Sequence, residues 1–255
     1  MAHKLYIITG ASRGMGLAMA RQLLAPDNRL LCISRKRNEA LQAEADKAGC
    51  TLQQWAMDLA EPLPVAQALQ AWLMQEQAAG TIELACLINN AGVITPPGPV
   101  DGVGLAELSN ALRVGLEATV LLTAAFLHAS SGWPADRRVL NISSGLGRRA
   151  MAGSAPYCAA KAGMDNFSRA VALDEQAQRG ERGARIVSLA PGIIDTDMQA
   201  QLRGGDPGRF PDQPRFASFK SEGQLDSPEG AAAKVLRYLA RADFGSNVLG
   251  DVRDA

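Results

Sequence analysis

Short hydrophobic runs of β-forming residues alternate along this chain with longer amphipathic segments. The runs predict seven strands, over residues 4–9, 29–34, 51–57, 84–89, 138–143, 185–189 and 247–252. Helical periodicity occupies residues 14–24, 37–48, 63–79, 105–128, 155–179 and 228–240. Strands that alternate with helices in this way form a parallel sheet covered by helices on both faces. We therefore predict an α/β fold with a doubly wound, seven-stranded parallel sheet.

One segment departs from this alternation. Residues 196–227 are rich in glycine and proline and show no sustained periodicity. A loop of this length in a compact domain is usually a lid or a binding loop, so we expect it to shape a substrate site together with residues 93–104. No repeat or low-complexity linker interrupts the rest of the chain, which predicts a single domain over residues 1–255.

Composition and charge restrict the partners. The 255 residues are 47% hydrophobic, and 26 basic and 26 acidic residues give a formal net charge of zero. The basic residues form no long block, so we expect no nucleic-acid and no membrane partner. The first strand follows Met1 without room for a signal peptide, and no apolar stretch reaches the roughly 18 residues that a span requires. These features predict a cytoplasmic protein.

Residues that form disulfides or bind metals are few and scattered. The chain contains Cys32, Cys50, Cys86, Cys158, His3 and His128. The cysteines fall in unrelated elements without CxxC spacing, so neither a disulfide framework nor a metal site is expected.

A glycine-rich turn, TGASRGMG, begins at Thr9 directly after the first predicted strand. Gly10, Gly14 and Gly16 allow the backbone to turn tightly and to approach a pyrophosphate, while the following helix offers free N–H groups and its positive dipole end. Three residues separate the first two glycines, so the GxGxxG fingerprint is not matched as written, and an ordinary turn is the alternative. The strand, turn and helix together favour a dinucleotide site.

The end of the second strand indicates which dinucleotide binds. An NAD enzyme has a carboxylate there for the ribose 2′-hydroxyl, whereas this chain reads SRKR from Ser34. Arg35, helped by Arg13, can bind a 2′-phosphate through charge-assisted hydrogen bonds, and we therefore predict NADP(H). The neighbouring Lys36 and Arg37 are also explained as solvated charges at a helix start.

Polar residues follow three further strands, at the sheet edge where ligands bind in such folds. Asp58, beside the Leu59 backbone, can accept from an adenine amino group or cap a helix. Asn90 lies in NNAG and Ser144 in NISSGLG. A hydroxyl at Ser144 can donate to a substrate carbonyl, although Ser-Ser-Gly is also a common turn sequence.

Tyr157 and Lys161 are four residues apart, which places a phenol and an ammonium on one helix face. Free tyrosine titrates near a pKa of about 10, and an adjacent positive charge favours the phenolate. The pair can therefore act as an acid toward a carbonyl oxygen. Such pairs also occur by chance on solvated helix faces, so the other motifs decide its meaning.

With these residues in place, the chain resembles the short-chain dehydrogenase/reductase family. The motifs that carry the resemblance are TGxxxGxG from Thr9, NNAG from Asn89, Ser144, YxxxK from Tyr157, and Pro191-Gly192. They extend over essentially the whole chain and imply a Rossmann-fold oxidoreductase with hydride transfer at the nicotinamide C4. By this resemblance Tyr157 is the general acid, Lys161 holds the nicotinamide ribose and lowers the pKa of Tyr157, and Ser144 orients the carbonyl.

The expected cofactor contacts follow from the same motifs. They are Gly10, Ser12, Arg13, Gly14, Met15 and Gly16 at the phosphates, Arg35, Asp58, Leu59, Asn90 and Ala91 on the adenosine side, and Tyr157, Lys161, Pro191, Gly192, Ile194 and Thr196 around the nicotinamide.

A finer resemblance is to sepiapterin reductases and the related bacterial benzil-type diketone reductases. It is carried by SR at Ser34 with NEAL from Asn38, by APGIIDTDMQ from Ala190, and by FGS at Phe244 leading to GDV at Gly250. It implies a ketone or a vicinal dicarbonyl as substrate. In sepiapterin reductases an aspartate near the C-terminus anchors the pterin, so Asp251 is expected to contact the substrate with Ser144 and Tyr157. A surface or strand-capping role for Asp251 is the alternative.

Gly115 departs from the family pattern. Many members have an asparagine there, which supports a water chain to the active-site lysine. Glycine in a helix interior costs about 1 kcal/mol relative to alanine, so Gly115 makes room for a water, marks an irregularity, or is a small-residue packing site. It is the only feature that favours a catalytically silent NADP-binding sensor over an NADPH-dependent carbonyl reductase.

The sequence also bears on assembly and on enzyme class. Apolar faces on residues 105–128 and 155–172 exceed what one sheet face needs, and the family resemblance implies that they pair in a homodimer or homotetramer, with core packing as the alternative. Nucleotide-sugar epimerases and dehydratases also have a Tyr-x-x-x-Lys pair. They usually carry TGxxGxxG and a longer C-terminal domain, which this sequence lacks.

Overall fold

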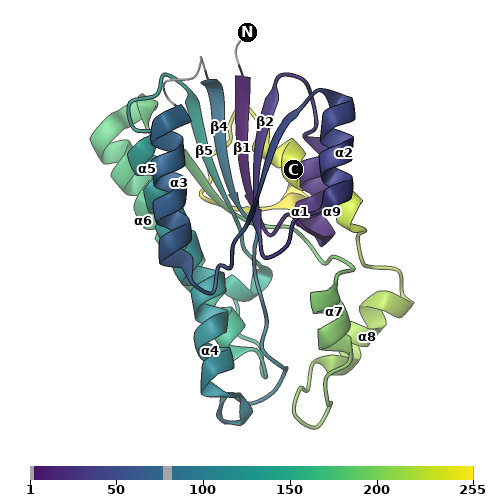
Figure 1. Cartoon of the computed structure of the whole chain (residues 1–255). Helices are drawn as coiled ribbons and strands as arrows, with labels where there is room; N and C mark the ends of the chain where they lie inside the picture. Colours follow the sequence, from purple (N-terminus) through teal and green to yellow (C-terminus); the bar gives the residue numbers. More distant parts are fainter. Residues whose placement is uncertain (1–2, 77–81, 255) are drawn as a thin grey trace.

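Seven parallel strands form the centre of the structure, a computed structural model that describes residues 3–76 and 82–254 (Figure 1). The strands are β1 His3–Thr9, β2 Asn28–Ser34, β3 Thr51–Ala56, β4 Ile82–Asn89, β5 Asp136–Ile142, β6 Arg185–Ala190 and β7 Leu249–Asp251. Their order is β3-β2-β1-β4-β5-β6-β7. The predicted doubly wound parallel sheet is confirmed, and each predicted strand is present with ends shifted by no more than two residues.

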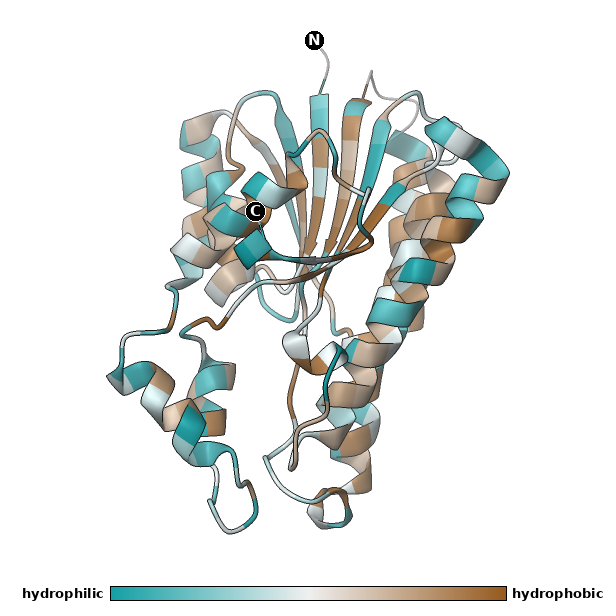
Figure 2. Ribbon diagram, turned by 180° about the vertical axis from the view of Figure 1, so that it is seen from behind, coloured by the Kyte–Doolittle hydropathy of each residue, from teal (hydrophilic) through white to brown (hydrophobic). Residues whose placement is uncertain are grey.

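Alternate residues of the strands contribute to two hydrophobic cores. On β1, Tyr6 and Ile8 belong to one core, and Leu5 and Ile7 belong to the other. Helices α1 Gly14–Gln22, α2 Glu39–Ala48 and α9 Pro228–Leu239 cover the first face, and α3 Pro62–Glu76, α5 Ala118–Ala129 and α6 Ala155–Arg179 cover the second (Figure 1). Figure 2 shows that apolar residues predominate where these helices face the sheet. Burial on both faces explains why the strands are almost continuously hydrophobic.

The predicted helices are found, with two differences. The helix expected over 63–79 is α3, which begins at Pro62; the last residues of that expectation lie outside the described part of the chain. The helix expected over 105–128 comprises α4 Leu105–Leu112, a π-helical turn at Arg113–Glu117, and α5. A π turn admits one extra residue per turn, which hydrophobic periodicity does not reveal.

Residues 196–227 are not a structureless loop, contrary to the prediction. They contain α7 Asp197–Arg203 and α8 Gln213–Ser221. The Thr196 hydroxyl caps α7 by accepting from the Gln199 amide, and Pro214 occupies the first turn of α8. Helices of 7 and 9 residues are too short to give a clear periodic pattern. In Figure 1 they extend below the sheet as an arm opposite α4.

The expectation that no segment has the length and apolarity of a membrane span is wrong by those two criteria. Leu105–Ala129 is a continuous helical segment of 25 residues with a mean hydropathy of 1.4 in its most apolar window. Half of that window is buried inside the protein. Leu122 and Phe126 of this segment are part of the hydrophobic core, and this burial accounts for much of its apolar composition.

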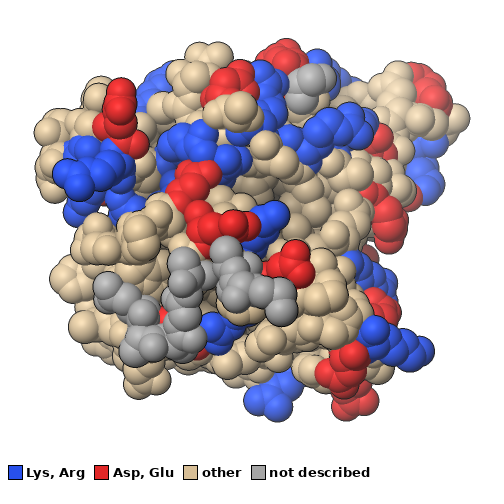
Figure 3. Space-filling view, turned by 90° about the horizontal axis from the view of Figure 1, so that it is seen from above, with Lys and Arg blue, Asp and Glu red and all other residues tan. Residues whose placement is uncertain are grey.

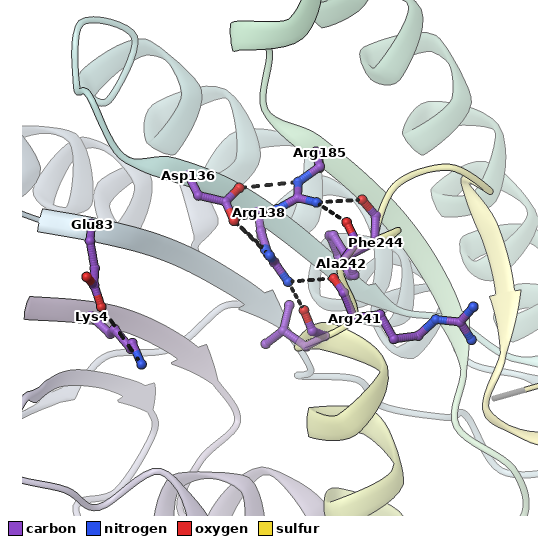
Figure 4. A network of polar contacts seen from close by, with 9 residues as sticks. Lys4, Glu83, Asp136, Arg138, Arg185, Arg241, Ala242 and Phe244 are labelled. Atoms are coloured by element: carbon purple, nitrogen blue, oxygen red, sulfur yellow. Dashed lines mark hydrogen bonds and ion pairs between the residues drawn. The ribbon is translucent and has the colours of Figure 1, made fainter.

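An ion-pair network fixes the N-terminal ends of β5 and β6 (Figure 4). Asp136 accepts from Arg138 at 2.9 Å and from Arg185 at 2.5 Å, and both arginines also donate to backbone carbonyls that follow α9. Burial raises the pKa of Asp136, but hydrogen bonds from the two arginines bring it below its ordinary value. Figure 3 views this end of the molecule, where basic and acidic side chains alternate over the described surface.

Candidate active site

A cavity of about 1320 Å³ lies at the C-terminal ends of the strands. The connection reverses direction between β1 and β4, which opens a crevice at this edge of a doubly wound sheet. Every site residue predicted from the sequence lines this cavity: Gly10, Ser12, Arg13, Gly14, Met15, Gly16, Arg35, Asp58, Leu59, Asn90, Ala91, Ser144, Tyr157, Lys161, Pro191, Gly192, Ile194, Thr196 and Asp251. Residues far apart in the sequence therefore form one continuous surface.

The glycine turn is held from the neighbouring strand β4. The Asn90 side-chain amide donates to the carbonyl of Thr9 at 2.9 Å, and the Thr9 hydroxyl accepts from the backbone amides of Asn90 and Ala91. Gly10 has a φ of +68°, and a Cβ at Gly16 would lie 2.3 Å from the Gly10 carbonyl oxygen. Only glycine permits this close packing of turn and helix.

Helix α1 points its N-terminus at this turn without a cap of its own. Its N-cap residue, Arg13, makes no side-chain capping bond, and no acidic residue occupies the first turn. The free amides and the positive dipole end suit the phosphates of a dinucleotide, so the residues present fit such a cofactor.

Ser144, Tyr157 and Lys161 come together where β5 meets α6. Ser144 lies at the end of β5 in extended conformation, and its hydroxyl accepts from the Leu146 amide at 3.2 Å. Lys161 is only 3% exposed, donates to the Ile142 carbonyl at 2.7 Å, and places its ammonium 5.7 Å from the centre of the Tyr157 ring. Regular helical spacing on α6 produces the Tyr157 and Lys161 contact.

Burial dominates the protonation behaviour of this group. It raises the pKa of Tyr157, and a hydrogen bond from Ser144 lowers that pKa only in part. Burial is therefore the largest influence on the pKa of Tyr157, and its direction is opposite to the lowering expected from Lys161. Burial also lowers the pKa of Lys161 to about 8, against a raising effect of Asp165.

Asp165 is a component of the site that the sequence analysis missed. It is 3% exposed and accepts 2.6 Å hydrogen bonds from the hydroxyls of Ser143 and Ser188, while Arg148 lies 3.5 Å from its other oxygen. The sequence contains a signal for it, because Asp165 follows Lys161 by four residues, the same spacing by which Lys161 follows Tyr157, and this places all three on one helix face. Its carboxylate connects α6 to β6 and to Ser143, the residue that follows β5 and precedes Ser144.

The arginines predicted for a 2′-phosphate differ in their surroundings. Arg35 is exposed and forms no ion pair or side-chain hydrogen bond within the described ranges 3–76 and 82–254. Arg13 pairs instead with Asp197 at the start of α7, across the cavity mouth. Asp58 accepts from the Ala60 amide at 3.0 Å in the turn before α3, which begins only at Pro62, so this bond stabilises a turn and does not cap the helix. Asp58 also lines the cavity.

Asp251 lies in the cavity wall with its carboxylate already bound. Both oxygens contact Arg253, at 2.8 and 2.5 Å, and the Arg253 amide donates to the same group. These hydrogen bonds lower the pKa of Asp251 below its ordinary value. A ligand would therefore meet a paired carboxylate here rather than a free one.

Gly115 is buried inside the π turn, next to α6. A Cβ at this position would lie 3.1 Å from Cβ of Ala160, which is tighter than ordinary contact. Two of the interpretations considered for Gly115 are therefore observed: it lies in a helix irregularity, and it is a small-residue packing site. Its packing partner, Ala160, immediately precedes Lys161 in the sequence.

Comparison with known proteins agrees with this geometry. Residues 4–206 match the family model for short chain dehydrogenase. A benzil reductase ((S)-benzoin forming) of Bacillus cereus is 34% identical over 240 residues, covering 93% of this chain and 94% of the relative. A sepiapterin reductase of Meriones unguiculatus is 32% identical over 259 residues, covering 97% and 95%.

The fold comparison gives the same result. The crystal structure of a 3-oxoacyl-[acyl-carrier protein] reductase from Brucella melitensis, in complex with NAD, superimposes with a TM-score of 0.79 at 24% identity, covering 99% of this chain and 96% of that one. The chain therefore belongs to the short-chain dehydrogenase family of oxidoreductases, whose members use a nicotinamide cofactor.

Proposed function

We propose that this protein is an NADPH-dependent carbonyl reductase that reduces a ketone or a vicinal dicarbonyl to an alcohol. The observation that carries the proposal is that Ser144, Tyr157 and Lys161 meet in the same cavity as the glycine turn. The relatives named benzil reductase and sepiapterin reductase support a dicarbonyl or a related ketone as substrate class.

The chemistry follows from the positions of three side chains. Bound NADPH supplies the hydride. The Ser144 hydroxyl orients the carbonyl oxygen, and Tyr157 donates its proton to that oxygen as negative charge develops on it. Burial keeps the phenol protonated at neutral pH, because it raises the pKa of Tyr157. The Lys161 ammonium holds the nicotinamide ribose and favours the phenolate left after proton transfer.

NADP(H) rather than NAD(H) is proposed from Arg35. Its exposed guanidinium lines the cavity after β2 without a carboxylate partner in the described chain, and a 2′-phosphate is a suitable bidentate ligand. We expect Arg35→Asp to lower kcat/KM for NADPH by about 10- to 100-fold, because one strong ion pair becomes a repulsion. NADH should be affected much less. Equal losses with both cofactors would refute this role.

Turnover is tested by following NADPH oxidation with benzil, sepiapterin, aliphatic diketones and simple aldehydes. We expect dicarbonyls to react with the highest kcat/KM. Asp251→Ala should raise KM for sepiapterin if the carboxylate anchors a pterin, and an unchanged KM would remove Asp251 from the substrate site. A cytoplasmic location forms part of the same proposal.

A silent NADP-binding sensor remains the second candidate, on the basis of Gly115. The contact between Gly115 and Ala160 gives that glycine a packing role, which leaves the catalytic side chains intact. Tight NADPH binding without turnover on any of these carbonyls would favour the sensor.

We also propose a homodimer or homotetramer built on α4 and α6. Leu105 and Leu112 on α4 and Leu173 on α6 are exposed, at 85%, 41% and 71%. Exposed leucines on neighbouring helices are typical of an interface. Light scattering at low protein concentration tests this assembly, and a monomer would contradict it.

A further inference from the structure

The charged groups that line the cavity are not balanced. Its carboxylates are Asp58, Asp195, Asp197, Asp226 and Asp251. All of them except Asp58, on the adenosine side, are paired with a basic side chain, in the ion pairs Asp195 with Arg203 and Lys220, Asp197 with Arg13, Asp226 with Lys234, and Asp251 with Arg253. The acidic groups toward the substrate end are therefore already neutralised by the protein.

Three arginines of the cavity have no such partner in the described part of the chain, and two of them are not assigned to the cofactor. Arg149 and Arg215 are exposed side chains in its wall, and neither forms an ion pair within residues 3–76 and 82–254. Arg35 is also unpaired, but it is assigned to the cofactor. Uncompensated guanidinium groups in a concave site raise the local positive potential and select for an anionic ligand.

Both arginines lie at the substrate end of the cavity. Arg149 follows the short helical turn Gly145–Gly147 that begins immediately after Ser144, and it precedes Tyr157 on α6. Arg215 lies on α8, in the arm whose first helix begins after Thr196. They come from two different walls of the cavity: Arg149 from the connection between β5 and α6, which also carries Ser144, and Arg215 from the arm.

An aromatic surface accompanies Arg215. Its guanidinium lies 5.6 Å from the centre of the Phe219 ring, and Phe219 packs edge-on against Phe216 at 5.6 Å. Phe216 in turn contacts Phe210, which is fully buried. Arg215 is thus placed over an aromatic group that is fixed to the rest of the protein, while Phe216 and Phe219 line the cavity itself.

The arm is fixed to the opposite wall by close packing. A Cβ at Gly153 would lie 3.0 Å from the Phe210 ring and 3.1 Å from the Gly98 amide, and Gly98 donates to the Gly153 carbonyl at 3.0 Å. The wall that carries Arg149 and the arm that carries Arg215 are therefore in contact through Gly153 and Phe210. Their arrangement reduces the ordering that a ligand must impose on binding.

We propose that the cavity binds a carbonyl substrate with a carboxylate on an aromatic or otherwise flat apolar body, and that Arg149 and Arg215 bind this carboxylate. The apolar part of the substrate packs on Phe216 and Phe219, and its carbonyl reaches Ser144 and Tyr157. This inference rests on the proposed reductase function and adds the charge of the substrate. Guanidinium groups bind carboxylates through paired, charge-assisted hydrogen bonds.

A matched substrate pair tests the proposal by turnover. The pair is 1-phenylpropane-1,2-dione and its para-carboxylate, which present the same two carbonyls and differ in one charge. We expect wild-type protein to prefer the carboxylate in kcat/KM on the order of tenfold, through KM. In the double variant Arg149→Met/Arg215→Met the ratio of kcat/KM for the carboxylate to that for the neutral dione should fall to about one. Arg237→Met is the matched control, because Arg237 is exposed on α9 outside the cavity, and this variant should keep the wild-type ratio. A wild-type ratio of about one or below would overturn the proposal.

A binding measurement separates this inference from the reductase proposal. Naphthalene-2-carboxylate and naphthalene-2-carboxamide are titrated calorimetrically into protein saturated with NADP+. We expect the carboxylate to bind about tenfold more tightly in wild type, with the difference reduced by added salt and lost in the double variant. This result without carbonyl turnover would refute the reductase and keep the anion site. Dicarbonyl turnover with equal affinity for the two naphthalene compounds would refute the anion site and keep the reductase.

Discussion

Asp165→Asn tests whether the buried carboxylate sets the protonation of Lys161. Asparagine has nearly the same shape, and its side-chain oxygen can still accept from Ser143 and Ser188. The negative charge that raises the pKa of Lys161 is lost. Burial then acts on the ammonium without compensation.

The size of the effect follows from the geometry of α6. Residues four apart on a helix have Cβ atoms about 5–6 Å apart. Two unit charges about 6 Å apart in an effective dielectric constant of about 20 interact by roughly 3 kcal/mol, which corresponds to a change of about two in pKa. Because the pKa of Lys161 is about 8 in the intact protein, Asp165→Asn should place it near or below neutrality.

The assay is the pH dependence of kcat/KM for NADPH at saturating carbonyl, which reports on the free enzyme. Reduction needs the Lys161 ammonium, so activity is present below its pKa and is lost as the pH rises through it. In wild type the loss should begin near pH 8, and in Asp165→Asn about one to two pH units lower. Ser188→Ala is the control, since it removes one hydrogen bond to Asp165 without changing charge.

A profile for Asp165→Asn that superimposes on the wild-type profile, with only a uniform decrease in rate, would refute this reasoning. Asp165 would then serve to pack α6 against the sheet. A shift toward higher pH would contradict the sign of the electrostatic argument itself.

Three further substitutions have expected outcomes. Gly16→Ala should weaken NADPH binding, measured by calorimetry, about 10- to 100-fold, because the added Cβ would lie 2.3 Å from a backbone oxygen. Gly204→Ala is the control, since its Cβ meets only ordinary contacts and the variant should bind NADPH as wild type does. Wild-type affinity in Gly16→Ala would contradict the close packing. Asp136→Asn should lower the free energy of unfolding, measured in urea at neutral pH, by about 1–3 kcal/mol, because two arginines lose their carboxylate partner. The difference between wild type and variant should disappear as the pH falls through the lowered pKa of Asp136. Equal stabilities at neutral pH would refute this role of Asp136. Gly115→Asn should destabilise the fold by about 1–3 kcal/mol without raising turnover, because its Cβ presses on Ala160; a many-fold gain in turnover would show that the missing amide limits activity.

The sequence was sufficient for the sheet and for the residues around the cavity. Short continuous hydrophobic runs identify the strands because both sheet faces are covered, and fixed helical spacing places Lys161 beside Tyr157. The glycine turn was also predictable, since the contact between Gly16 and Gly10 excludes every other residue at that point.

Other features depend on contacts between distant residues and leave no local pattern. Helices α7 and α8 are short and are fixed by packing of Phe210 against Gly153. The pairing of Arg13 with Asp197, and of Asp251 with Arg253, decides which charges stay free in the cavity. The pKa of Tyr157 was predicted from one neighbour, whereas burial, which is not visible in a sequence, determines its direction.

The central claim, proton donation by Tyr157 during NADPH-dependent carbonyl reduction, is tested most directly by comparing wild type with Tyr157→Phe on benzil. We expect the wild type to oxidise NADPH and the variant to lose about 10²- to 10⁴-fold in kcat, the usual contribution of a general acid, while it still binds NADPH. Turnover by Tyr157→Phe at the wild-type rate would contradict the assigned acid. Tight NADPH binding by a wild type that reduces no carbonyl would contradict the reductase itself.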